Sequence, residues 1–156
     1  MSISPFHGGL EWQEPLNNVT SDNGSLNSRD INEFFNPRPA DPSLSLQDRY
    51  NLCESVGESP KEVTTTERLM TLLEKKQMFR CYDGFEPSGR MHIAQGIMKA
   101  INVNKITSAG GIFIFWVADW FALLNNKMDG DLEKIRTVGR YFVEVWKAAG
   151  MNLANV

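Results

Sequence analysis

Residues 81–96 read CYDGFEPSGRMHIAQG, and this stretch indicates how the chain folds. The residues at 79–82 are apolar-rich and prone to β structure, so we expect a short strand that the Asp-Gly pair at 83–84 ends. Loop-forming residues follow at 87–89, and a helix is expected from about His92 to Thr107. A strand, a loop and a helix in this order form the unit from which parallel sheets are built.

A second unit of the same kind follows this stretch. Ala109-Gly110-Gly111 ends the helix, and the nearly continuous apolar run Ile112–Val117 is typical of a strand buried on both faces of a parallel sheet. Asp131 is the expected N-cap of a last helix, with Gly150 at its carboxyl end. One apolar stripe runs along that helix and consists of Ile135, Val138, Phe142, Val145 and Ala149.

Two helices are expected before the first strand. Ser45 is a plausible N-cap for the first, and residues 59–62 have the form of a capping box for the second, which ends near Lys76. Residues 1–42 are rich in Asn, Ser, Pro, Gly and Asp without helical or strand periodicity, so they are expected to be a disordered N-terminal extension. Residues 43–156 are expected to form one partial domain.

The predicted fold class is therefore α/β, the first half of a Rossmann-type parallel-sheet domain preceded by two helices. Residues 151–156 suggest the approach to a third strand, and a doubly wound sheet needs more strands than the sequence provides. The sequence is thus expected to be the front part of a larger domain.

Composition excludes several classes of protein. The net charge of −3 does not indicate a nucleic-acid surface, and the two cysteines have neither metal-ligand spacing nor a disulfide framework, so no metal site is expected. No apolar run approaches the ~18 residues that span a bilayer. The N-terminus carries acidic residues and resembles neither a secretory signal nor a transit peptide, so the expected location is the cytosol, away from membranes.

The residues at 83–95 are candidates for ligand binding. In an open parallel sheet, ligands bind beyond the carboxyl ends of the strands. Gly84 and Gly89 would let the backbone approach a ligand, and the free N–H groups at the following helix start favour phosphate. His92 could donate to a phosphate oxygen there, although a lone histidine at a helix start is more often a cap or a surface residue.

Two motifs resemble a known family. Pro87–Gln95 resembles the class I aminoacyl-tRNA synthetase signature, in which His-hydrophobe-Gly-His opens a helix after the first Rossmann strand. Tyr82–Gly89 and Ala118–Asn126 look specifically like archaeal and eukaryotic tyrosyl-tRNA synthetases, with the plant cytosolic enzymes nearest. The signature departs at two places: its Gly is Ala94, and its second His is Gln95, which can donate a hydrogen bond but carries no charge.

The resemblance implies that residues 43–156 are part of a class I synthetase catalytic domain, and it assigns roles to individual residues. Tyr82 would hydrogen-bond the phenolic hydroxyl of bound tyrosine, and Gly84, Glu86 and Asp119 would line the amino-acid pocket. Trp116 and Phe121 would either wall that pocket or pack in the core. The expected ATP element consists of Pro87, Ser88, Gly89, His92, Ala94 and Gln95, with His92 and Gln95 as the catalytic residues.

The implied reaction is the ATP-dependent activation of L-tyrosine to tyrosyl-adenylate, with Mg²⁺ accompanying ATP, and transfer to tRNA(Tyr) by a homodimer. The sequence contains no Lys-Met-Ser-Lys-Ser-like loop and no anticodon-binding domain, so the chain alone is expected to be inactive in ATP–pyrophosphate exchange. Two alternatives are a small nucleotidyltransferase and a non-catalytic truncated product that associates with the full-length synthetase.

Overall fold

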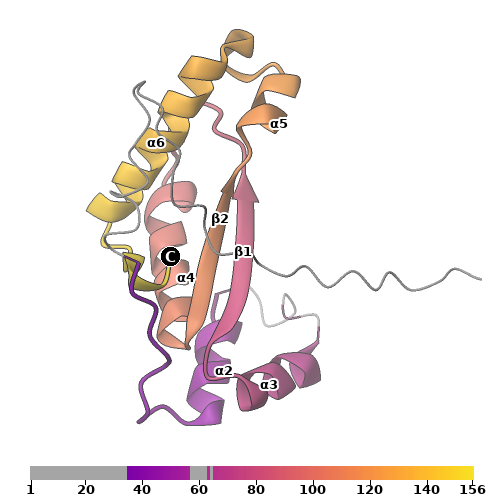
Figure 1. The fold of residues 1–156 in the computed structure, drawn as a ribbon, viewed down its shortest axis with the longest axis vertical. Coiled ribbons are helices and arrows are strands. Elements are labelled where there is room, and N and C mark those ends of the chain that lie inside the picture. The colour runs from indigo at the N-terminus through magenta and orange to yellow at the C-terminus, as the bar shows by residue number, and fades with distance from the viewer. Residues whose placement is uncertain (1–34, 57–62, 64) are drawn as a thin grey trace, which may run out of the picture.

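A computed structural model describes residues 35–56, 63 and 65–156. The described chain forms a two-stranded parallel sheet with helices against one face and at both ends of the strands (Figure 1). The helices are α2 (Leu46–Glu54), α3 (Thr66–Lys75), α4 (Lys99–Ser108), α5 (Asp119–Leu124) and α6 (Leu132–Ala148), and the strands are β1 (Phe79–Phe85) and β2 (Gly111–Val117). A π-helical turn η2 (Ala94–Met98) and the 3-10 turns η3 (Lys127–Gly130) and η4 (Leu153–Asn155) complete the elements.

Strand β1 is longer than the sequence predicts. The two strands pair in parallel from Phe79↔Gly111 to Phe85↔Val117, and Gly84 lies opposite Trp116 within this ladder. The backbone N–H of Ala118 also donates to the Phe85 carbonyl at 2.9 Å. The prediction that 83–84 ends the strand was wrong, because ladder hydrogen bonds to a neighbouring strand outweigh the weak β preference of Asp and Gly.

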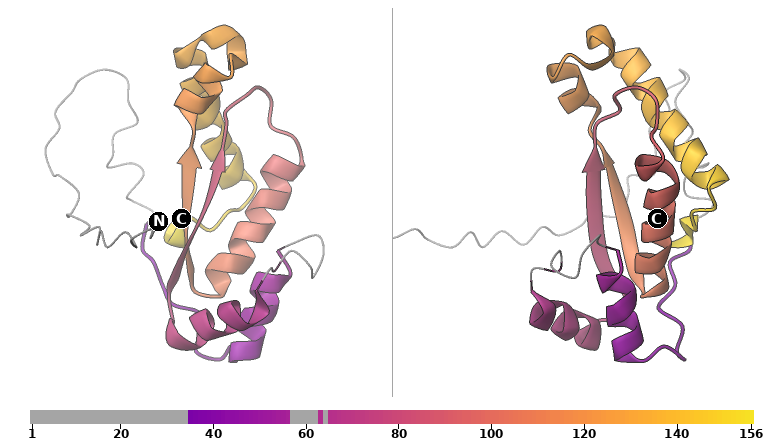
Figure 2. Two further views of the ribbon diagram at one scale, coloured as in Figure 1. Left: turned by 90° about the vertical axis from the view of Figure 1, so that its right-hand side faces the viewer. Right: turned by 180° about the vertical axis from the view of Figure 1, so that it is seen from behind.

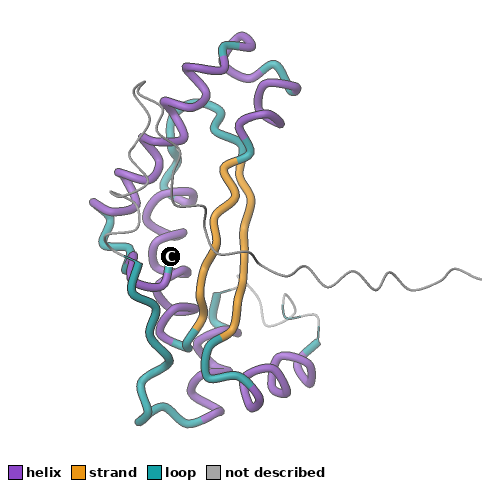
Figure 3. Tube along the Cα trace, viewed as in Figure 1, coloured by secondary structure: helices purple, strands orange, loops and turns teal. Residues whose placement is uncertain are grey.

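Among the described residues, helices cover one face of the sheet. Helices α4 and α6 lie on the same side of both strands, as the views in Figure 2 and the trace in Figure 3 show. On the other face, which we call the open face, Tyr82, Ile114 and Trp116 are exposed. The prediction that β2 is buried on both faces is therefore wrong for the described chain, although its apolar composition was correctly taken as a strand signal.

The core has two parts. Between the sheet and α4 and α6, the buried residues are Ala100, Val103, Phe142, Trp146 and Met151, with Phe85 and Phe115 of the strands packed on them. At the other end of the strands, the second cluster is formed by buried residues of α2, α3, the start of β1 and the C-cap of α4, namely Tyr50, Cys53, Leu73, Phe79 and Ala109. These two clusters hold the strands at a fixed position relative to the helices.

A buried arginine joins the second cluster to the sheet. Arg49 of α2 is only 4% exposed, and its guanidinium donates to the carbonyls of Leu73 at 2.7 Å, Lys76 at 2.8 Å and Ala109 at 2.9 Å. A fourth bond reaches the Gln77 carbonyl at 3.3 Å. The positive charge thus lies at the carboxyl end of α3, where the helix leaves carbonyls without intrahelical partners.

Two predicted helix starts are confirmed, whereas the helix expected from about His92 begins with the π turn at Ala94 and becomes α-helical only at Lys99. Ser45 and Asp48 form a capping box, and the Asp131 carboxylate accepts from the Lys134 N–H at 3.1 Å. The predicted stripe of α6 is partly wrong, because Trp146 is buried while Ala149 is exposed. Helix α5 was not predicted, and the capping box at 59–62 lies outside the described residues.

The segment that precedes α2 contacts the last turn of the chain. The Asn36 N–H donates to the Ala154 carbonyl at 2.9 Å, and the Arg38 N–H donates to Oδ1 of the buried Asn155 at 2.9 Å. We call residues 35–44 the strap. Residues 1–34 of the expected extension lie outside the described residues. Residues 151–156 contain the 3-10 turn η4 rather than the approach to a strand.

Candidate functional site

The candidate residues gather at the carboxyl ends of the two strands. Both strands point toward the end of the molecule that carries α5 and the loop 86–93 (Figure 1). Because polar backbone groups and loop side chains converge at such an edge, this is where ligands bind in parallel sheets. The site residues divide into an open-face group, a strand-end group and a helix-start group.

The open-face group consists of Tyr82, Gly84 and Trp116. Tyr82 is 76% exposed and projects from the open face, where it lies opposite Ile114 in the strand register. Gly84 lies opposite Trp116, and a Cβ at Gly84 would lie 3.8–4.0 Å from atoms of Trp116, in ordinary contact. Trp116 makes an edge-to-face contact with Phe121 of α5, with ring centroids 6.0 Å apart. The group is thus an exposed aromatic floor with one phenolic hydroxyl.

Glu86 and Asp119 form the strand-end group. The Asn125 side-chain amide donates to Glu86 Oε1 at 2.6 Å, which ties the end of β1 to the end of α5. The neighbouring Pro87 is fully buried, and α6 approaches it at Gly139, where an added Cβ would lie 3.5 Å from Pro87 Cγ and 3.0 Å from Val117 Cγ1. The position of Glu86 is therefore fixed by packing on one side and by a hydrogen bond on the other.

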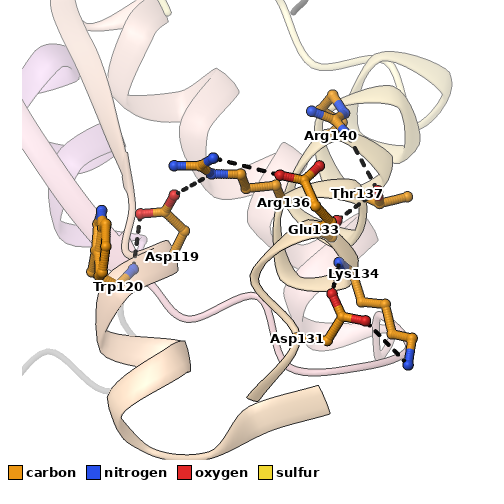
Figure 4. A network of polar contacts seen from close by, with 8 residues as sticks. All are labelled: Asp119, Trp120, Asp131, Glu133, Lys134, Arg136, Thr137 and Arg140. Atoms are coloured by element: carbon orange, nitrogen blue, oxygen red, sulfur yellow. Dashed lines mark hydrogen bonds and ion pairs between the residues drawn. The ribbon is translucent and has the colours of Figure 1, made fainter. Parts of the chain in front are cut away.

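Asp119 belongs to a polar network with the first turns of α6 (Figure 4). Its Oδ2 accepts from Arg136 Nε at 3.0 Å, and its Oδ1 accepts from the Trp120 N–H at 2.8 Å. Arg136 also lies 3.7 Å from Glu133. Arg136 thus pairs with Asp119 and fixes the orientation of its carboxylate. Residue types and spacing gave no signal for this pairing, because the two residues lie on different helices.

The helix-start group contains the candidate ATP residues. Gly89 has a φ of 114°, a conformation that favours glycine, so the loop can turn there. His92, Ala94 and Gln95 are exposed. The His92 N–H donates to Gln95 Oε1 at 3.3 Å, so the Gln95 side chain closes the first turn and keeps its amide N–H groups free to donate.

Two further residues were missed by sequence reasoning. Lys99, at the start of α4, pairs with the Asp83 carboxylate on the covered face of the sheet. The Trp146 indole N–H donates to the Gln95 carbonyl at 2.7 Å. An indole in an apolar stripe is usually a packing residue, so only the structure shows its contact with the helix start.

The structure brings the predicted residues together in part. The open-face and strand-end groups lie around the same strand ends, whereas the helix-start group lies on the side of the sheet that α6 covers. Within the described residues, no hydrogen bond or ion pair links His92 or Gln95 to Tyr82, Glu86 or Asp119. The arrangement thus offers one aromatic surface with carboxylates at its rim and, separately, a helix start with free donors.

The described residues include no group of three or more His, Cys, Asp or Glu side chains that could hold a metal ion. No helix among the described residues is long and apolar enough to cross a membrane.

Comparison with known proteins relates this geometry to a family. Residues 52–156 match the sequence model of the family described as tRNA synthetases class I (W and Y). The chain belongs to this family. Members of the class use ATP, so a nucleotide site is part of this synthetase fold.

Similar sequences are tyrosine–tRNA ligases, which confirms the resemblance seen in the motifs. The cytoplasmic tyrosine–tRNA ligase 1 of Arabidopsis thaliana is 62% identical over 110 residues, which are 70% of this chain and 28% of that protein. The cytoplasmic tyrosine–tRNA ligase 2 of the same plant is 58% identical over 114 residues, or 73% of this chain and 15% of that protein. The chain thus spans less than a third of the length of these relatives.

Solved synthetase structures share the fold. Leishmania major tyrosyl-tRNA synthetase in complex with tyrosinol is 61% identical, with a TM-score of 0.67 over 72% of this chain and 16% of that chain. The Aeropyrum pernix enzyme is 31% identical, with a TM-score of 0.65 over 72% of this chain and 33% of that one. These neighbours confirm the predicted Rossmann-type class I synthetase fold.

Proposed function

We propose that this chain carries the tyrosine- and ATP-recognition part of a tyrosine–tRNA ligase active site. The observation that carries the proposal is the exposed hydroxyl-bearing Tyr82 on an aromatic floor, in a chain whose relatives are tyrosine–tRNA ligases. The solved Leishmania relative holds tyrosinol, which has the tyrosine side chain. In the complete protein, tRNA(Tyr) and a second copy of the enzyme are the proposed partners, in the cytosol.

The open-face and strand-end groups would bind the amino acid. The Tyr82 hydroxyl can exchange a hydrogen bond with the phenol of L-tyrosine, while Trp116 offers an apolar surface for its ring. The amino acid's ammonium group requires negative charge, which Glu86 and Asp119 supply at the rim. Asn125 and Arg136 hold these two carboxylates in place, so little ordering is needed when the ligand binds.

The helix-start group would bind ATP. The carboxylate of tyrosine attacks the α-phosphorus, a new carboxyl O–P bond forms, and the bond to the β-phosphate breaks as pyrophosphate leaves with its electron pair. The carboxylate is already ionised, so no general base is needed, and positioning with charge stabilisation supplies the catalysis. Exposed His92, the free amide of Gln95 and the helix N–H groups are the proposed phosphate donors, and Mg²⁺ would enter bound to ATP.

The experiment is a calorimetric titration of the chain with L-tyrosine and with L-phenylalanine. We expect the chain to prefer tyrosine, because a site built to hydrogen-bond a hydroxyl rejects the analogue that lacks it. Tyr82→Phe should weaken tyrosine binding and leave phenylalanine binding unchanged. The matched control is Tyr141→Phe, an exposed tyrosine on α6. Equal affinity for the two amino acids, or no binding of either, would contradict the proposal for this chain.

A further inference from the structure

Trp146 makes an unusual contact for a core residue. It lies on α6 and is 3% exposed, and its indole N–H leaves its own helix to donate to the Gln95 carbonyl at 2.7 Å. A buried indole N–H needs an acceptor, but many positions could supply one. Here the acceptor is the backbone of the turn that carries the proposed ATP residues.

That turn has π-helical rather than α-helical hydrogen bonds. The Met98 N–H donates to the Ile93 carbonyl at 3.2 Å, and the Lys99 N–H reaches the Ala94 carbonyl. In an α-helix the Lys99 N–H would bond the Gln95 carbonyl four residues back. The π register diverts this donor, and the Trp146 indole takes its place. Single π turns of this kind occur frequently at functional sites.

The indole is itself held rigidly. It stacks on Phe115 with ring centroids 4.4 Å apart, and its edge meets Phe85 at 5.1 Å. Phe85 and Phe115 belong to the two strands, so the sheet fixes the ring position. The turn lies close against α6, because a Cβ on the buried Gly96 would lie 3.8 Å from Val145 Cγ1.

Gln95 connects the indole of Trp146 to His92 through two hydrogen bonds. Its carbonyl is held by Trp146, and its side-chain oxygen accepts the His92 N–H at 3.3 Å. A continuous path of contacts therefore runs from the strands through the indole and Gln95 to the start of the helix. Gln95, which replaces the signature's second histidine, is thus held at its backbone carbonyl and at its side-chain oxygen, and its side-chain amide N–H groups are its remaining side-chain donors.

We propose that Trp146 is a positioning residue for nucleotide binding, because its indole N–H stabilises the π turn that orients Gln95 and His92. The proposal rests on the proposed function for the identity of the nucleotide, ATP. The role of the indole in the π turn does not depend on the proposed function.

The test is Trp146→Phe in the full 156-residue chain. Phenylalanine keeps an aromatic ring against Phe115 but removes the donor. We expect hydrogen exchange at the Met98 and Lys99 amides, followed by NMR, to become faster. Affinity for Mg-ATP should fall by about tenfold, the effect of losing one hydrogen bond that orders the turn, while affinity for L-tyrosine should change by less than about twofold.

The control variant is Phe142→Leu, which damages the same cluster without removing a hydrogen bond. Phe142 is 2% exposed and stacks on Phe85 with centroids 5.5 Å apart. We expect it to lower the unfolding midpoint while the exchange at 98–99 and the Mg-ATP affinity remain those of the parent chain. The proposal would be overturned if Phe142→Leu weakened ATP binding as much as Trp146→Phe, or if Trp146→Phe left the exchange unchanged.

A parent chain that does not bind Mg-ATP would contradict the nucleotide site of the proposed function. The exchange comparison would then still decide the role of the indole. Faster exchange at 98–99 in Trp146→Phe alone supports that role, and equal exchange in both variants overturns it.

Discussion

At the scale of single residues, the site depends on carboxylates whose partners come from other helices. Asp119 begins α5, but Arg136 of α6 determines the direction of its carboxylate. Both side chains are partly exposed, so the ion pair contributes only about 0–1 kcal/mol to folding. Its importance is therefore expected in ligand binding rather than in stability.

Asp119→Asn tests this division. Removing the charge should weaken L-tyrosine binding by about tenfold or more, because a hydrogen bond to a charged group contributes about 1.5–3 kcal/mol. The melting temperature should stay close to that of the parent chain. Glu133→Gln is the matched control, since the Glu133 carboxylate is 78% exposed and lies 3.7 Å from the same arginine. Calorimetry that shows equal losses for the two variants would refute the role of Asp119.

The two thiols make a second residue-scale prediction, which concerns pH. Burial raises the pKa of Cys53 to about 11, although the nearby positive charge of Arg49 reduces this rise. Burial, together with the neighbouring Cys53, raises the pKa of Cys81 to about 12. In the unfolded chain a thiol ionises near pH 8.5. Above that pH the unfolded state loses protons that the folded state keeps, so the free energy of unfolding should fall as pH rises from about 8.5.

Urea unfolding at a series of alkaline pH values measures this decline. The double variant Cys53→Ala, Cys81→Ala should show a shallower decline than the parent chain, because the two titrating groups are gone. The comparison separates the thiols from tyrosines and lysines, which titrate in both proteins. An identical slope for the two proteins would show that the thiols do not contribute.

At the scale of elements, the start of α6 is determined by a hydrogen bond between residues that are close in the sequence. Asp131 caps α6, and the backbone N–H of Lys134 lowers the pKa of its carboxyl group. A lowered pKa means that the stabilising charge is present above the carboxyl group's ordinary pKa and is lost as pH falls through the folded-state value. Helix α6 carries both Arg136 and Trp146, so its start affects the whole site.

Asp131→Ala should lower the melting temperature by a few degrees, because it leaves the first N–H groups of α6 without an acceptor. Asp131→Asn should retain most of the stability at neutral pH, since Asn is an equally good N-cap. Between neutral pH and pH 3, the stability of the parent chain should approach that of the Asn variant. Thermal melts followed by circular dichroism would contradict this if Ala and Asn had equal effects.

The sequence predicts features that depend on neighbouring residues, such as helix caps, better than features that depend on distant contacts, such as which face of the sheet is covered. Ser45, Asp131 and the apolar run of β2 act on their immediate neighbours, so their elements were predicted close to their observed bounds. The open face, the π turn at Ala94 and the pairing of Asp119 with Arg136 depend on contacts between distant segments. Tyr82 and His92 could be named as site residues only through the family motif, because their residue types alone favour packing and surface roles.

At the scale of the whole molecule, one buried charge connects three segments. Arg49 bridges α2, the carboxyl end of α3 and the residue before the turn into β2. Four backbone carbonyls depend on this guanidinium. The two helices at the base of the sheet are thus attached by hydrogen bonds as well as by the apolar cluster around Leu73.

Arg49→Met should lower the free energy of unfolding by about 3 kcal/mol or more, because methionine fills the space but leaves buried carbonyls unpaired. Urea unfolding provides the measurement. The control is Arg68→Met, an exposed arginine on α3, for which a change within about 0.5 kcal/mol is expected. A loss in Arg49→Met no larger than that of the control would show that water replaces the guanidinium.

The contact of the strap with the last turn has a consequence for the order of folding. Arg38 and Asn155 are 117 positions apart, yet two hydrogen bonds join them. A ribosome synthesises the strap before its partner, which lies 117 positions further along the chain. Closing so long a loop carries a large entropic cost that only a nearly complete structure can offset. The strap is therefore synthesised early but binds its partner late in folding. Formation of the hydrogen bonds between residues 35–44 and η4 would then mark the completion of folding of the described chain.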